Sequence, residues 1–440
     1  MFISNSPTVK AVPKGTRIYF ATALILIGAL YVLPKALPAH IGTGYIGIFL
    51  GLTAISVLVW YREAMPPKSV LNLSLPLVLL LVPLAPYLSN DVQRYMWDGA
   101  VFLSGFDPYV TAPNDPLVSH LRGIWPTPEE HAQYPTLYPP GALTLFGVCA
   151  LAGPVFGLWV WKAMVTAALL CSLILSYKLL EHRQLLRHFP LIGLSPLLLF
   201  ETQIGGHLDV FSLLGIVAAL WCLEKEKLLA AGLIIGLAAT IKFLPAVIIG
   251  PFLFFLKPKQ ALKLLIVSAG TWLSIYAVMF GLGYKPLGLL PTFFEKWRGG
   301  APIYPALEAI QTGLGLSAKQ FLALILGLAI AGFGVSAGLA RKGFIEIALL
   351  LTLAVPLLLS PVLFPWYLMA LVPFLALKPN LTLFTAITLA PLSYVVLNKW
   401  LSVGVWEQAD WPAQILLGGL IAAFSFDLFF TRRPIGRIAA

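Results

Sequence analysis

Four side chains able to bind substrate or exchange protons recur at helical spacing in Asp91-Val-Gln-Arg-Tyr-Met-Trp-Asp98-Gly. If this segment is a helix, Asp91, Arg94, Tyr95 and Asp98 share one face. The segment directly follows an apolar stretch in a chain that is 59% hydrophobic and only 11% charged. Ionisable groups at a membrane edge are costly, so we expect a carboxylate here to act as a general base. The structural alternative is a helix cap at Asn90 and Asp91, with Asp98 simply paired to Arg94.

The composition predicts an integral membrane protein. The mean hydropathy is +0.89, and apolar stretches of about 20 residues, the length that a spanning helix needs, recur along the chain. We predict one all-α polytopic domain over residues 1–440, with no room for a separate soluble enzyme. The three cysteines show no metal-ligand spacing, so we predict neither a metal nor another cofactor. The net charge of +11 lies in short loops between apolar stretches, which indicates membrane topology and not nucleic-acid binding.

Hydropathy and proline positions predict about 14 transmembrane helices. Their expected ranges are 18–34, 43–60, 71–88, 155–178, 189–204, 208–223, 228–241, 244–257, 262–282, 320–340, 345–360, 362–378, 381–398 and 413–430.

Charge asymmetry predicts the orientation. With both termini in the cytoplasm, 19 of the 29 basic residues fall in cytoplasmic segments, as the positive-inside rule requires: Lys10, Lys14, Arg17, Arg62, Lys68, Lys178, Arg183, Arg187, Lys225, Lys227, Lys257, Lys259, Lys263, Arg341, Lys342, Lys378, Arg432, Arg433 and Arg437. The long loops 89–141 and 283–317, expected to carry short amphipathic helices, then lie outside. We therefore expect chemistry at the periplasmic or outer face of the cell's inner (plasma) membrane.

A second polar group lies in Glu201-Thr-Gln-Ile-Gly-Gly-His207-Leu-Asp209, the predicted turn between two short spans. Gly205 and Gly206 permit a tight reversal of the chain. The turn would present His207 and Asp209 at membrane depth, where they could bind sugar hydroxyls or assist the base. Alternatively, His207 is a structural residue with satisfied hydrogen bonds. A third interpretation is that His207 and Asp209 bind a metal ion.

Two cationic positions could meet an anionic head group. Lys242, in Thr240-Ile-Lys-Phe-Leu-Pro245, interrupts an apolar run and could bind phosphate as a point charge, or it could extend to the interface as an ordinary lysine. Arg298 lies in the outer loop near Lys296, and this loop could close over a site or be solvated.

Aromatic and proline-rich segments accompany these groups, in Tyr134-Pro-Thr-Leu-Tyr138-Pro-Pro-Gly141 and in Ser360-Pro-Val-Leu-Phe-Pro-Trp366-Tyr367. Such aromatic rings can stack on sugars or line lipid grooves, but we favour the interpretation that they are ordinary interfacial belt residues and helix-start prolines.

Four motifs occur in order along most of the chain: Asp91-x-x-Arg-Tyr-x-Trp-Asp98-Gly…Gly105-Phe-Asp-Pro-Tyr109, Tyr138-Pro-Pro-Gly141, Glu201…Gly-His207-x-Asp209 and Lys242-x-x-Pro245. Together they resemble the GT-C superfamily of integral-membrane glycosyltransferases, and most closely the bacterial polyprenyl-phosphate-mannose-dependent mannosyltransferases. Many members have one span before the acidic motif, whereas three apolar stretches precede it here. Two additional spans preserve its sidedness.

The resemblance implies transfer of a sugar, with mannose the first expectation, from a polyprenyl-phosphate donor to a glycan or glycolipid acceptor, with inversion. Asp91 would remove the acceptor proton, with Asp98 as a second catalytic carboxylate. The implied substrate-binding residues are Arg94, Tyr95, Tyr109, Tyr138, Glu201, His207, Asp209, Lys242 and Arg298. A nucleotide sugar is not expected, because no phosphate-binding glycine-rich loop is present.

Three other functions fit parts of the pattern. A transporter or flippase for a lipid-linked sugar would need charged groups near the bilayer midplane and often shows internal repeats, whereas the charges here gather at one face. A ligase or polymerase that moves a whole glycan would use closely related chemistry. A non-catalytic assembly protein of the same fold would not need Asp91.

Overall fold

The computed structural model describes residues 14–127, 129 and 132–430, and in these ranges it contains helices and no β-strand. Lys10, Arg432, Arg433 and Arg437, which the orientation used, lie outside the described residues. The helices are α1 (Lys14–Ala36), η1 (Pro38–His40), α2 (Ile41–Tyr61), α3 (Pro67–Leu81), α4 (Asp91–Leu103), η2 (Pro116–Leu121), α5 (Pro140–Leu151), α6 (Gly153–His182), η3 (Leu186–His188), α7 (Pro190–Gly193), α8 (Pro196–Gln203), α9 (Asp209–Glu224), α10 (Leu228–Ile241), η4 (Leu244–Ile248), α11 (Ile249–Phe255), α12 (Pro258–Gly281), α13 (Leu290–Lys296), α14 (Tyr304–Gly313), α15 (Ala318–Arg341), α16 (Ile345–Leu358), η5 (Pro365–Leu371), α17 (Val372–Leu377), α18 (Leu381–Leu389), η6 (Ala390–Val396), α19 (Leu397–Val403) and α20 (Trp411–Phe430).

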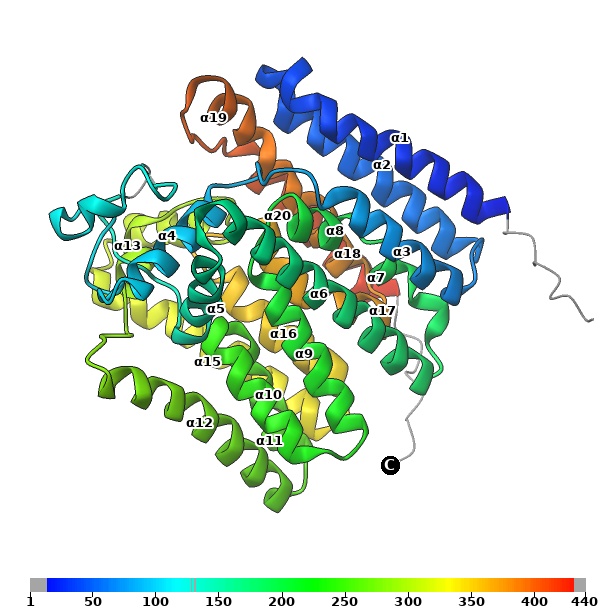
Figure 1. The fold of residues 1–440 in the computed structure, drawn as a ribbon. Coiled ribbons are helices and arrows are strands. Elements are labelled where there is room, and N and C mark those ends of the chain that lie inside the picture. The colour runs from blue at the N-terminus through cyan, green and yellow to red at the C-terminus, as the bar shows by residue number, and fades with distance from the viewer. Residues whose placement is uncertain (1–13, 128, 130–131, 431–440) are drawn as a thin grey trace, which may run out of the picture.

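The architecture confirms an all-α polytopic membrane protein. Among the described residues, seven helices are long and apolar enough to cross a membrane: Gly15–Ala36, Pro38–Tyr61, Gly153–His182, Pro258–Gly281, Ala318–Arg341, Leu381–Val403 and Trp411–Phe429. Six shorter apolar helices pack among them: Pro67–Leu81, Pro140–Leu151, Leu228–Ile241, Leu244–Phe255, Ile345–Leu358 and Pro365–Leu377. Figure 1 shows most of the long helices running obliquely in a similar direction.

Proline and glycine decide where several helices break. The stretch 189–204, expected to be one span, consists instead of the short helices α7 and α8. The break falls where Pro196 starts α8 and Ser195 caps it by accepting a hydrogen bond from the Leu198 amide. Gly153, with a φ of +76°, separates α5 from α6. The sequence did not predict α5, because its residues adjoin the loop expected at 89–141.

Helices α4 and α5 form a tightly packed pair that fixes the acidic motif. A Cβ atom added at Gly99 of α4 would lie 2.3 Å from the carbonyl oxygen of Phe146 in α5. The Tyr95 ring stacks on Phe146 with centroids 4.6 Å apart and an interplanar angle of 9°. Close backbone approach and ring stacking therefore hold the face that carries Asp91.

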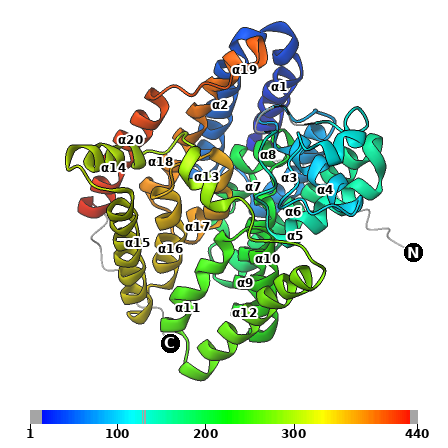
Figure 2. The same ribbon diagram turned by 90° about the vertical axis from the view of Figure 1, so that its left-hand side faces the viewer.

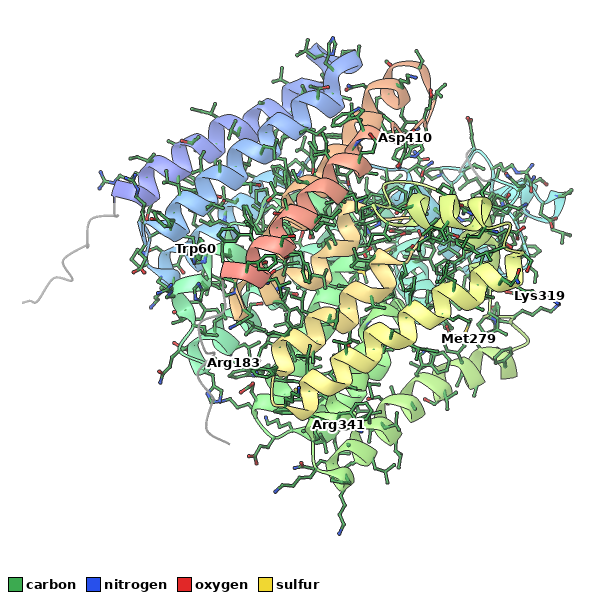
Figure 3. All side chains as sticks on the ribbon, turned by 180° about the vertical axis from the view of Figure 1, so that it is seen from behind. Trp60, Arg183, Met279, Lys319, Arg341 and Asp410 are labelled. Atoms are coloured by element: carbon green, nitrogen blue, oxygen red, sulfur yellow. The ribbon has the colours of Figure 1, made fainter. Side chains whose placement is uncertain are left out.

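The short helices of the two long loops meet at one end of the molecule. Figure 2 looks onto this end and shows α13 near the centre, with α4 on one side and α14 on the other. Arg183 and Arg341 lie toward the opposite end from Lys319 and Asp410 (Figure 3). There Arg183 of α6 forms ion pairs with Glu224 of α9 and, at 2.5 Å, with Glu346 of α16.

Candidate active site

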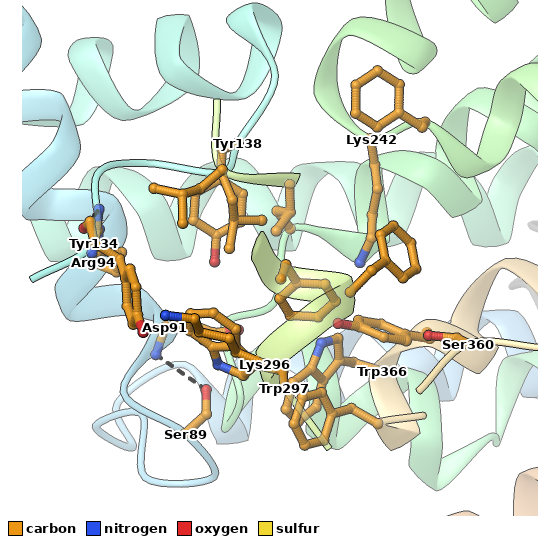
Figure 4. A pocket seen from close by; sticks show the side chains of 18 of the residues that line it. Ser89, Asp91, Arg94, Tyr134, Tyr138, Lys242, Lys296, Trp297, Ser360 and Trp366 are labelled. Carbon is orange, nitrogen blue, oxygen red and sulfur yellow. Dashed lines mark hydrogen bonds between the residues drawn. The ribbon is translucent and has the colours of Figure 1, made fainter. Parts of the chain in front are cut away.

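A cavity of about 1000 Å³ is lined by residues of α4 and α13 together with more distant segments. Its walls come from segments far apart in the sequence, and Figure 4 shows Asp91, Arg94, Tyr138, Lys242 and Trp366 around it. Other lining residues include Tyr134, Phe293, Lys296, Trp297, Arg298, Phe364, Tyr367 and Trp406. A concave space with apolar walls and a few convergent polar groups is typical of a ligand site.

Asp91 begins α4 and presents its carboxylate to the cavity. Its side chain is 28% exposed, and its amide donates a hydrogen bond to Ser89 Oγ at 3.3 Å. Tyr95 lies behind it, fully buried and outside the cavity lining, with its hydroxyl donating to Asp91 Oδ2 at 3.5 Å. Tyr95 therefore contacts Asp91 and does not reach the cavity itself.

Arg94 lines the cavity, whereas Asp98 lies behind it. Arg94 Nε donates to Asp98 Oδ1 at 2.8 Å, and its Nη2 donates to the Tyr134 carbonyl at the same distance. Burial raises the pKa of Asp98, although the Arg94 charge and a hydrogen bond with Thr136 partly offset this. Asp98 holds the guanidinium in place and does not line the cavity, as the structural alternative anticipated.

The turn 201–209 lies behind the cavity wall. Glu201, His207 and Asp209 are all buried, and only Leu208 of this turn lines the cavity. The His207 ring stacks on Trp366, with centroids 3.8 Å apart and an interplanar angle of 13°. The structure thus places Glu201, His207 and Asp209 next to the cavity. Their side chains contact other side chains of the protein and do not face the cavity itself.

Helix α6 fixes the shape of this turn. Trp161 Nε1 donates to the Gly206 carbonyl at 2.7 Å, where Gly206 adopts a φ of +66°. Lys162 Nζ donates to the Gln203 carbonyl and, at 2.7 Å, to the Leu84 carbonyl. Lys162 falls inside the predicted span 155–178, and nothing in the neighbouring sequence identifies either carbonyl as its partner.

Lys242 enters the cavity at the end of α10. Its ammonium group forms an ion pair with Asp209 and lies 4.1 Å from the centroid of the Tyr367 ring. The helix stops here because Lys242 adopts an extended conformation before Pro245. The ammonium is therefore held by an ion pair and a cation–π contact.

Tyr109 and Arg298 belong to the two long loops, 89–141 and 283–317. Tyr109 is buried and does not line the cavity. The neighbouring Asp107 accepts hydrogen bonds from the Tyr109 amide at 2.9 Å and the Lys285 amide at 3.0 Å, which joins the two loops. Arg298 lines the cavity and forms an ion pair with Glu308 at 2.8 Å.

Helix α13 supplies aromatic lining that the sequence did not single out. Trp297, which follows α13 directly, packs on Tyr134 of the first long loop with ring centroids 4.9 Å apart, and Phe293 stacks on Trp297 at 5.5 Å. Lys296 Nζ lies 5.5 Å from the centroid of the Tyr134 ring. The only local signal was the aromatic and basic run Phe-Phe-Glu-Lys-Trp at 293–297, which is also compatible with an exposed loop.

The lining has an excess of cations. Among its described residues, Asp91 is the only carboxylate, against Arg94, Lys242, Lys296 and Arg298. Within the described ranges, no three His, Cys, Asp or Glu side chains are grouped so that they could hold a metal ion. The arrangement suits an anionic ligand next to one acceptor of protons.

A family model described as Glycosyltransferase family 87 matches residues 136–361, just over half of the chain. The matched range contains Tyr138, the turn 201–209, Lys242 and Arg298, whereas Asp91 lies outside it. No curated protein and no solved structure matches the chain.

Proposed function

Since the chain belongs to glycosyltransferase family 87, we propose that this membrane glycosyltransferase transfers mannose from a polyprenyl-phosphate donor to a glycan or glycolipid acceptor. The transfer takes place at the outer face of the plasma membrane, with both termini in the cytoplasm. The observation that carries this proposal is the pairing, in one cavity, of a single carboxylate with several cations.

The charges around the cavity suit a donor with one phosphate. Three of the four lining cations each have a carboxylate partner outside the lining, in the pairs Arg94–Asp98, Lys242–Asp209 and Arg298–Glu308. Within the described residues, Lys296 forms no such ion pair. With Asp91 counted, the four cations and four carboxylates sum to zero, which suits a phosphodiester with a single negative charge, as in polyprenyl-phosphate mannose, better than a more highly charged diphosphate.

Asp91 is the proposed general base. The acceptor hydroxyl attacks the anomeric carbon from the face opposite the phosphate while Asp91 takes its proton. The bond between the anomeric carbon and the phosphate oxygen breaks, and the electron pair leaves with the phosphate, so the configuration inverts. The Asp91 side chain is 28% exposed and lines the cavity, so an acceptor hydroxyl bound there can reach its carboxylate.

Lys242 and Arg94 stabilise the departing phosphate. Negative charge develops on the leaving oxygen in the transition state, and cations already held in position stabilise it without reorganisation. Lys242 is fixed by Asp209 and Tyr367, and Arg94 by Asp98 and the Tyr134 carbonyl. The aromatic walls suit the apolar faces of the sugar and the first isoprene units of the lipid.

The test uses purified protein in liposomes with radiolabelled polyprenyl-phosphate mannose, and with synthetic alkyl hexosides or a bacterial lipid extract as acceptors. We expect labelled product from the wild type and a loss of at least about 10²-fold in Asp91→Asn. Asp410→Asn makes the same chemical change at an exposed site outside the cavity, and it should retain full activity. If the wild type moves the donor between leaflets without cleaving it, the protein is a transporter and the proposal is wrong.

A further inference from the structure

Three buried polar side chains outside the cavity lining form a series of contacts that begins at Asp91. His207 Nδ1 lies 3.4 Å from Asp91 Oδ2, and His207 Nε2 lies 3.4 Å from Glu201 Oε2. The Tyr394 hydroxyl donates a hydrogen bond to the same Glu201 oxygen at 2.7 Å. Of these four residues only Asp91 lines the cavity. The polar groups of the other three can therefore influence the reaction through Asp91.

The contacts of His207 restrict where protons can lie. Each ring nitrogen faces a carboxylate oxygen, so each contact is favourable only with a proton between its two atoms. One proton then lies between Nδ1 and Asp91, and a second lies between Nε2 and Glu201, on either of those atoms. Two protons shared by two carboxylates and one imidazole leave a net charge of −1. Since an isolated buried charge is much more costly than a partly exposed one, this charge belongs on Asp91, where a general base needs it.

The surroundings of His207 hold its ring in this orientation. Trp366 covers one face of the ring, and a Cβ atom added at Gly205 would lie 2.3 Å from the ring's Cδ2. Neither 3.4 Å contact forms a hydrogen bond in this structure, and both ring nitrogens are without a hydrogen-bond partner among the described residues. Catalytic hydrogen bonds are often long or poorly aligned in substrate-free sites and tighten when the substrate binds.

We propose that His207 is a positioning residue for Asp91, and that Glu201 and Tyr394 orient His207. This inference depends on the proposed function, because it assumes that Asp91 is the base. It assigns Glu201 and His207 a role behind the cavity wall, where they keep the Asp91 carboxylate ionised and directed at the acceptor hydroxyl, and not a role in binding sugar hydroxyls.

The test compares His207→Gln, Glu201→Gln and Tyr394→Phe in the liposome assay with polyprenyl-phosphate mannose. We expect kcat to fall about 10–100-fold in the first two variants, as is usual when the partner of a reacting group is lost. Tyr394→Phe removes one hydrogen bond, so we expect a smaller loss of up to about tenfold. The KM for the donor should not change in any variant, because none of these side chains lines the cavity.

Tyr45→Phe is the matched control for Tyr394→Phe. Tyr45 is buried, its ring lies 5.0 Å from that of Tyr394, and its hydroxyl has no hydrogen-bond partner among the described residues. It should keep the wild-type kcat. Tyr394→Phe also keeps the ring and its packing, so it tests the proposal even if the glutamine variants fold poorly.

The double variant His207→Gln/Glu201→Gln distinguishes a shared role from separate ones. If Glu201 acts through His207, the double variant should be about as slow as the slower single variant. Losses that multiply, or a raised donor KM with unchanged kcat, would overturn the inference. If Asp91→Asn is inactive while all three single variants keep the wild-type kcat, the inference fails but the proposed function stands. Full activity in Asp91→Asn would remove the proposed function itself.

Discussion

Lys242 and Asp209 form an ion pair across the cavity wall, with the lysine in the lining and the aspartate behind it. Asp209 begins α9 and Lys242 follows α10, so the pair joins the ends of two adjacent helices. The side chain of Asp209 is only 3% exposed and that of Lys242 is 24% exposed. Loss of Lys242 therefore leaves the buried Asp209 charge without a partner and also removes a positive charge from the cavity lining.

Lys242→Met should lower the apparent melting temperature in detergent, because it leaves the Asp209 carboxylate buried without its counter-ion. Lys242→Met/Asp209→Asn should recover most of the lost stability, since no buried charge remains. Transfer should stay about 10²-fold below wild type in both variants, because the cation for the phosphate is absent. Scanning fluorimetry and the liposome assay measure the two effects.

Lys399→Met is the control for this prediction. Lys399 also pairs with a carboxylate, that of Glu407 at 2.6 Å, but both side chains are exposed and neither lines the cavity. We expect little change in melting temperature or in transfer. Recovery of transfer in the Lys242→Met/Asp209→Asn variant would show that the ammonium group has no part in the reaction.

The proposed orientation predicts which positions react with an impermeant thiol reagent. In a background in which Cys149, Cys171 and Cys222 are replaced by serine, Leu117→Cys should be labelled from outside intact cells. Leu117 is exposed and belongs to η2, in the first long loop.

Lys342→Cys, at the opposite end, should be labelled only after the cells are opened. Lys342 is exposed and follows α15 directly. The reverse labelling pattern at these two positions would place the cavity on the cytoplasmic side.

Gly99→Ala should destabilise the protein and reduce transfer. Its new Cβ would lie 2.3 Å from the Phe146 carbonyl oxygen, so α4 and α5 must separate, at a cost of about 1–3 kcal/mol. Because α4 carries Asp91 and Arg94, the shift should also lower kcat at temperatures where the variant is folded. Gly47→Ala is the control, since no atom lies within 4 Å of a Cβ added there. Equal melting temperatures for the two variants would contradict the tight packing of α4 on α5.

Asp98 should make stability depend on pH. Burial raises its pKa in the folded protein, so the folded state binds more protons than the unfolded state over the interval between the two pKa values. Its contribution to stability is therefore present below the ordinary pKa of an aspartate and is lost as the pH rises through the raised value. Asp98→Asn cannot titrate, so its melting temperature should fall less than that of the wild type between acidic and neutral pH. If the melting temperature of Asp98→Asn changes with pH as much as that of the wild type, Asp98 is not the cause of the pH dependence.

The sequence predicted the helices where their local patterns are strong. The predicted range 228–241 has the bounds of α10, and 345–360 and 413–430 agree with α16 and α20 to within a few residues. Hydropathy and proline positions are local properties, so they predict helices well. They failed at 189–204, where Pro196 begins a second helix, and at α5, which folds back against α4.

The sequence by itself determined that this is an all-α membrane protein with an acidic helix beside an apolar stretch. It also determined that Asp91, Arg94, Tyr95 and Asp98 lie along one helix, because their spacing fixes that. Only the tertiary structure decided that Asp91 and Arg94 line the cavity while Asp98 and the polar side chains of the turn 201–209 lie behind its wall. It alone brought His207 to Asp91 and Tyr394 to Glu201. Spacing along a helix gives the neighbours on that helix, whereas contacts between distant segments depend on how all the helices pack against one another.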